Sequence, residues 1–146
     1  MRKRKFYTEL IAAALILLFV YTGINKAMDH HIFALQLQKS PLLSRFSSLI
    51  AIILPAFEIM LALALSFYRT RLIALYTATG LLFIFTIYLA FILTYVKQLP
   101  CSCGGVISKM SWRQHIIFNL FFLILAVTGI VLQKINNKPE RRYAGI

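Results

Sequence analysis

Four long apolar stretches, separated by short polar segments, dominate the pattern of hydrophobic and polar positions along this chain. A helix needs about 20 predominantly apolar residues to cross a hydrocarbon core roughly 30 Å thick, and each stretch is close to this length. A lone open strand would leave its backbone groups unpaired in lipid, so the stretches are expected to be helices. The pattern predicts an all-α membrane protein, a single-domain bundle of four transmembrane helices at residues 6–24, 46–67, 72–96 and 116–132.

Basic residues are distributed unevenly between the polar segments on the two sides of the predicted bundle. If the N-terminus is inside, the inner segments hold ten of the 16 Lys and Arg residues. Cytoplasmic segments of membrane proteins are enriched in Lys and Arg, so we expect both termini in the cytoplasm. Lys26 is counted with the outer segments and Arg71 with the inner ones, and we interpret most of these charges as solvated or headgroup-facing anchors.

This topology also assigns the polar segments. The tail at residues 133–146 is expected to be cytoplasmic and frayed. Residues 25–45 and 97–115 become outer loops, and "HIFALQLQ" in the first of them is expected to be a short interfacial segment that covers the bundle.

Composition supports a membrane protein and changes how the net charge is interpreted. Hydrophobic residues make up 60% of the chain and charged residues 14%, against roughly 45–50% and about 25% in soluble domains. A net charge of +12 in a soluble protein would suggest nucleic-acid binding. Here the charges flank apolar stretches, so we expect the lipid bilayer as the partner and no nucleic acid. The expected location is the bacterial cytoplasmic (inner) membrane, as a multi-pass protein.

Small and polar residues recur at helical spacing in three of the stretches and predict the faces that contact other helices. The three predicted faces are Ala51, Pro55, Glu58, Ala62 and Ser66; then Thr79, Phe83, Thr86, Ala90 and Thr94; and finally His115, Asn119, Phe122, Ala126 and Gly129.

Glu58 stands out because a carboxylate within a transmembrane stretch is costly. We expect it to be protonated, paired, or facing a polar cavity. Pro55, one turn earlier, frees the carbonyl of Ala51, and a kink there would open a pocket beside the acid. The alternative is a neutral, structural Glu58 that is hydrogen-bonded to a neighbouring Tyr, Thr or Asn.

Cys101 and Cys103 are the only cysteines, and they lie in the second predicted outer loop. An oxidising compartment lets such a pair persist as a disulfide, and a small strained ring would exchange readily. A redox-active dithiol competes with two other interpretations, soft-metal binding by the two thiolates with His115, and an inert pair. His115 is either an acid/base in thiol exchange or an interfacial, hydrogen-bonded histidine.

The segments "YTGINKAMD", "ILPAFEIMLALAL", "PCSCGG" and "HIIFNLFF" make the chain resemble the MauE family of methylamine-utilisation proteins, within the wider DoxX-like group. The resemblance covers about Tyr7 to Leu132, and its specific parts are P-x-x-E and C-x-C-G. It implies a four-helix inner-membrane protein associated with redox or disulfide chemistry. In that family the role is to assist maturation of periplasmic methylamine dehydrogenase, with Cys101 and Cys103 as the redox pair and Glu58 as the intramembrane acid.

These observations favour thiol–disulfide exchange with a periplasmic thioredoxin-like or cysteine-containing protein. Cys101, Cys103 and His115 are the candidate catalytic residues, and no metal site is expected. Electrons would pass to a membrane quinone lodged near Glu58, Tyr88, Tyr95 and Asn119. The alternatives are a non-enzymatic assembly or anchoring subunit and a soft-metal carrier, so enzymatic activity is left open.

Overall fold

The computed structural model describes residues 2–38, 43–95 and 112–144, and every regular element in these ranges is helical. The elements in chain order are α1 (Arg2–Met28), α2 (His30–Gln38), the 3₁₀ turn η1 (Ser44–Phe46), α3 (Ser47–Ser66), α4 (Arg71–Tyr95) and α5 (Trp112–Ala144). The predicted all-α fold is therefore confirmed.

Four of the helices are long and apolar enough to cross a membrane. Their spanning segments are Lys3–Met28, Ser44–Ser66, Arg71–Thr94 and Arg113–Asn137. Helix α2 has nine residues, which is too short to span a bilayer. The predicted bundle of four transmembrane helices is confirmed, and the orientation of its termini stays a prediction.

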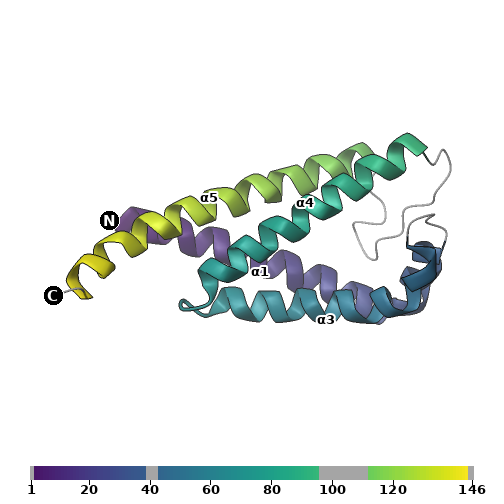
Figure 1. Ribbon diagram of the computed structural model, residues 1–146, viewed down its shortest axis with the longest axis horizontal. Coiled ribbons are helices and arrows are strands. Elements are labelled where there is room, and N and C mark those ends of the chain that lie inside the picture. The colour runs from purple at the N-terminus through teal and green to yellow at the C-terminus, as the bar shows by residue number, and fades with distance from the viewer. Residues whose placement is uncertain (1, 39–42, 96–111, 145–146) are drawn as a thin grey trace.

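The helices pack mainly as two pairs, α1 with α3 and α4 with α5 (Figure 1). Both termini and the turn between α3 and α4 lie at one end of the bundle, called here the termini end. Helix α2 lies at the opposite end, called here the α2 end. From the α3–α4 turn, α4 rises away from α3, so the two pairs are farther apart at the α2 end (Figure 1).

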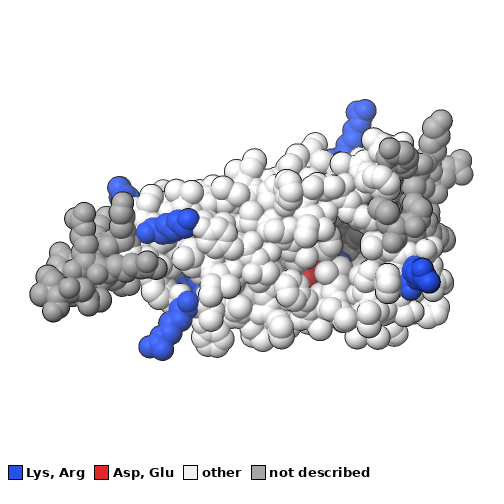
Figure 2. Space-filling model, viewed as in Figure 1, with Lys and Arg blue, Asp and Glu red and all other residues white. Residues whose placement is uncertain are grey.

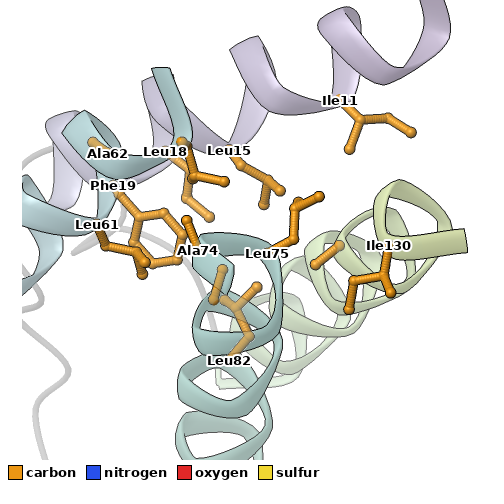
Figure 3. Packing of buried hydrophobic residues seen from close by; sticks show 13 residues of the cluster. Ile11, Leu15, Leu18, Phe19, Leu61, Ala62, Ala74, Leu75, Leu82 and Ile130 are labelled. Atoms are coloured by element: carbon orange, nitrogen blue, oxygen red, sulfur yellow. The ribbon is translucent and has the colours of Figure 1, made fainter. Parts of the chain in front are cut away.

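The hydrophobic core lies where the two pairs meet. Its fully buried side chains include Leu15 and Phe19 of α1, Leu65 of α3 and Leu75 of α4 (Figure 3). Large apolar side chains elsewhere, such as Leu17 at 71% exposed, point out of the bundle. A helical bundle with apolar residues on both its inside and its outside is suited to lipid surroundings.

The predicted contact faces of α3 and α5 are largely correct. Ala51, Pro55, Glu58 and Ala62 are buried on α3, while Ser66 is exposed and donates a hydrogen bond to the carbonyl of Ala62. On α5, Asn119, Ala126 and Gly129 are buried, and His115 and Phe122 are half-buried.

The predicted contact face of α4 is wrong. Phe83 is 54% exposed, and Ala90 and Thr94 are exposed as well. The hydroxyls of Thr79, Thr86 and Thr94 donate to carbonyls of their own helix at 2.7 to 2.8 Å, so they need no partner on another helix. The buried face consists instead of Arg71, Ala74, Leu75, Ala78, Leu82, Leu89 and Ile92.

The expected frayed tail is helical as far as Ala144, because α5 continues beyond its apolar part. Side chains of this extension bond to neighbouring segments. Asn136 Nδ2 donates to Thr8 Oγ1 at 3.1 Å, and the Tyr68 hydroxyl donates to Asn137 Oδ1 at 2.9 Å. These contacts tie the start of the predicted tail to α1 and to the α3–α4 turn.

Candidate functional site

A cavity of about 360 Å³ lies towards the α2 end of the bundle, between the two helix pairs. This volume falls within the range of about 300–1,000 Å³ that is typical of small-molecule sites. All four spanning helices and α2 line it, and most of the lining side chains are apolar. Figure 2 shows a small red acidic patch and a trace of blue beside a hollow in the uncharged middle of this face, while the other visible Lys and Arg side chains lie nearer the two ends. The polar lining residues are Thr22, Lys26, Glu58, Tyr88, His115 and Asn119.

Glu58 reaches this cavity from the middle of α3, and its side chain is 1% exposed. One carboxylate oxygen, Oε1, accepts a hydrogen bond from the Lys26 ammonium within an ion pair. The second oxygen, Oε2, is buried without a partner among the described residues. Glu58 is thus both paired and directed towards a cavity, two of the states expected for an acid inside a membrane span.

Lys26 comes from the last turn of α1 and points back into the bundle, with its side chain 11% exposed. Its Nζ lies 5.1 Å from the centre of the Phe85 ring and 5.8 Å from that of Phe33. These distances fall within the range of cation–π attraction. The ammonium is therefore held by one carboxylate and two aromatic rings.

Gly23 explains how α1 and α3 come close enough to form this ion pair. A Cβ at Gly23 would lie 3.1 Å from Cγ1 of Ile59 and 3.3 Å from the carbonyl oxygen of Pro55. Even a single methyl group there would require its neighbours on α3 to shift by a few tenths of an ångström, because such contacts are tighter than ordinary van der Waals distances. Gly23 lies one turn before Lys26 on the same helix, so the close approach places Lys26 beside Glu58.

The other polar lining residues come from α4 and α5. Tyr88 lies on α4, and His115 and Asn119 lie one turn apart on α5. Asn119 is 8% exposed, and Nδ1 of His115 is buried without a partner among the described residues. The structure thus brings together four residues singled out from the sequence, namely Glu58, Tyr88, His115 and Asn119.

The remaining sequence candidates lie outside the part of the chain that is described. Cys101 and Cys103 fall in the undescribed residues 96–111, and the side chain of Tyr95 is not described either. Within the described ranges, no group of three or more His, Cys, Asp or Glu side chains is placed to hold a metal ion.

Comparison with known families bears on the same residues. A family model described as "Methylamine utilisation protein MauE" matches residues 4–132, which include all six polar residues of the cavity. The chain belongs to the MauE family. Neither a search of curated proteins nor a search of solved structures found a significant match.

Membership in the MauE family and the four apolar helices confirm the predicted location. This is a multi-pass protein of the inner membrane. Its cavity is therefore surrounded by segments that cross a lipid bilayer.

Thr22 and Lys26 are the polar residues of this MauE-family cavity that sequence reasoning did not single out, and Lys26 was assigned to an outer loop. A signal was available, because Leu15, Phe19, Thr22 and Lys26 follow one helical face and the first two are fully buried. The predicted first span ended at residue 24, so the last turn of that face, which contains Lys26, was left out of the span.

Arg71 was assigned to the inner turn between the second and third spans, yet it is 5% exposed and lies at the termini end. Its Nη1 donates to Glu9 Oε1 at 2.5 Å, and its Nε donates to the carbonyl of Leu65 at 3.1 Å. Both basic residues that were expected in loops therefore serve contacts within the bundle.

Proposed function

We propose that this MauE-family protein is a membrane thiol–disulfide redox protein that assists disulfide formation in a periplasmic partner. The observation that carries the proposal is the apolar cavity with its buried Lys26–Glu58 pair. Helix α4 ends and α5 begins at the α2 end, where this cavity lies (Figure 1). The segment that joins these two helices contains Cys101 and Cys103. The two helix ends that flank the cysteine-containing segment in the sequence thus lie at the same end of the bundle as the candidate cofactor cavity.

The exchange balances as a two-electron reaction. A partner thiolate attacks one sulfur of the Cys101–Cys103 disulfide and forms a mixed disulfide, which the partner's second thiol resolves. The partner gains a disulfide, and Cys101 and Cys103 take up two electrons and two protons. With one cysteine pair, the chain needs an external acceptor to restore its own disulfide. A membrane quinone that is reduced to the quinol accepts both electrons and both protons.

The family description supports a choice of partner. Because the family model is that of a methylamine utilisation protein, we propose a cysteine-containing periplasmic protein of that process as the partner to test first. A thioredoxin-like carrier between the two proteins fits the same chemistry. We also propose that the chain is related to the wider DoxX-like group.

Trapping tests the proposal directly. Single Cys101→Ala and Cys103→Ala variants each keep one thiol, whose thiolate can attack the disulfide of an oxidised partner and release one partner thiol. No second cysteine of this chain is left to resolve the product, so one of the variants should accumulate a mixed disulfide with the partner. The measurement is a mobility shift on non-reducing gels of acid-quenched cells, with reducing gels as the control. We expect the Cys101→Ser/Cys103→Ser double variant to form no adduct and to leave the partner's cysteines reduced.

Two results would contradict thiol exchange. If neither single variant traps a partner and the double serine variant retains full function, the protein is a non-enzymatic assembly or anchoring subunit. If anaerobically purified wild type instead carries copper that the double serine variant lacks, it is a soft-metal carrier.

A further inference from the structure

Polar residues line the cavity from several sides. They come from all four spanning helices, so they converge on one space instead of lining a single helix face. Among the described residues, Glu58 Oε2 and His115 Nδ1 are buried without a hydrogen-bond partner. Buried polar atoms in native proteins are nearly always paired. Unpaired atoms that border a cavity therefore indicate a bound molecule with polar groups of its own.

The charges of the cavity favour a neutral ligand. Lys26 and Glu58 carry opposite charges, and both side chains are largely removed from solvent. An anionic headgroup attracted by Lys26 would also approach the Glu58 carboxylate, and a cationic one would approach the Lys26 ammonium. Adding an uncompensated charge to such surroundings is unfavourable.

Lys26 supplies the donors for such a ligand. A lysine ammonium has three N–H groups, and within the described part of the chain that of Lys26 donates to Glu58 alone. The rings of Phe33 and Phe85 lie beside it and offer flat apolar faces. The rest of the lining is mostly aliphatic, which suits a hydrocarbon tail. A neutral ring with carbonyl oxygens and an apolar tail matches the lysine donors, the aromatic faces and the aliphatic lining.

We propose that this cavity is a quinone site in which Lys26 donates a hydrogen bond to a ring carbonyl oxygen. Glu58 acts as a positioning residue that holds the ammonium in place. The inference rests on the proposed function for the redox role of the ligand. The Cys101 and Cys103 thiols form an S–S bond and release two electrons and two protons, which convert both quinone carbonyls to hydroxyls.

Equilibrium binding to the purified full chain in lipid nanodiscs tests this inference, with decylubiquinone as the probe and calorimetry as the readout. The wild type should bind it saturably. The Lys26→Met/Glu58→Gln double variant leaves no charge unpaired, and we expect it to bind at least about tenfold more weakly because the donor is gone. Lys134→Met, which removes a lysine beside Tyr76 outside the cavity lining, should bind like the wild type. Unchanged affinity in the double variant, or no saturable binding by the wild type, would overturn the proposal.

A pair of neighbouring substitutions tests the location independently of charge. Leu54 lines the cavity, whereas Ile53 next to it is 54% exposed. Leu54→Trp should fill the cavity and abolish decylubiquinone binding, while Ile53→Trp should bind like the wild type. Equal binding by the two variants would place the quinone elsewhere. Decanoate that binds as tightly as decylubiquinone would refute a site for neutral ligands.

The same assay separates this inference from the proposed function. The Cys101→Ser/Cys103→Ser variant exchanges no disulfide, yet it should bind decylubiquinone like the wild type. Binding of decylubiquinone without any trapped partner would support the quinone site and contradict thiol exchange. A trapped partner without decylubiquinone binding would contradict the quinone site and leave thiol exchange supported.

Discussion

At the scale of single residues, the two ion pairs in the described part of the bundle are expected to contribute very differently to stability. Lys26→Met leaves the buried Glu58 carboxylate without its counter-ion, which destabilises by about 3–5 kcal/mol in comparable cases. We expect the Lys26→Met/Glu58→Gln double variant to recover much of this loss, because no buried charge is left unpaired. The measurement is the free energy of unfolding in mixed micelles with increasing SDS.

The second ion pair supplies the matched control. Glu9 is 60% exposed whereas the Arg71 side chain is 7% exposed, so Glu9→Gln leaves the guanidinium next to a position that solvent reaches. We therefore expect a smaller loss of stability than in Lys26→Met. Arg71 keeps its hydrogen bond to the carbonyl of Leu65 in that variant. A loss in Glu9→Gln as large as that in Lys26→Met would mean that the exposure of the acid does not distinguish the two pairs.

Sequence reasoning identified the acid of the buried pair and missed its base. An acid in the middle of a long apolar stretch is conspicuous, because a carboxylate at that depth is costly unless it is paired or faces a polar space. A lysine near the end of a stretch is ordinarily an anchor at the membrane surface. Whether Lys26 reaches the surface or Glu58 depends on how closely α1 approaches α3. That distance follows from packing at Gly23, which the sequence of α1 alone does not specify.

At the scale of helices, the contact between α1 and α3 at Gly23 should tolerate little added volume. Gly23→Leu places atoms against Ile59 and the Pro55 carbonyl, so we expect a loss of about 1–3 kcal/mol in stability. Because the helices must separate, the Lys26–Glu58 pair should loosen, and decylubiquinone affinity should fall with it. Unfolding in SDS and calorimetric binding measure the two effects.

Gly80 on α4 is the matched control, since a Cβ there meets nothing within 4 Å. Gly80→Leu should be neutral or stabilising, because glycine lowers helix stability by about 1 kcal/mol relative to better helix formers. Equal losses at the two positions would point to a general intolerance of larger residues and would refute a specific contact at Gly23.

The helices also show how far a pattern of small and polar residues predicts contact. The prediction succeeded on α3 and α5, where Glu58 and Asn119 have side chains that cannot be satisfied by the carbonyls of their own helix turn alone. It failed on α4, where the threonine hydroxyls bond to their own backbone and leave alanine and leucine to make the contacts. Hydroxyl-bearing residues are therefore weaker evidence for an interior face than carboxylates or amides.

At the scale of the whole molecule, the two ends of the bundle differ in construction. The termini end is closed by polar contacts between helices, including Arg71 with Glu9 and Asn136 with Thr8. The α2 end holds the cavity. Lys26 and Arg71 both form ion pairs within the bundle, so each can be left out of the count of basic residues on its side. The excess of basic residues at the termini end then persists. The structure thus leaves the charge argument for cytoplasmic termini intact.

Cysteine labelling in intact cells tests this orientation. In a protein that lacks Cys101 and Cys103, a single Ser44→Cys at the α2 end should react with a membrane-impermeant maleimide added from outside. Arg69→Cys in the exposed α3–α4 turn should react only after the cells are permeabilised. The reverse pattern would place the α2 end in the cytoplasm. Cys101 and Cys103 would then face a reducing compartment in which disulfides rarely persist, and the proposed exchange with a periplasmic partner would fail.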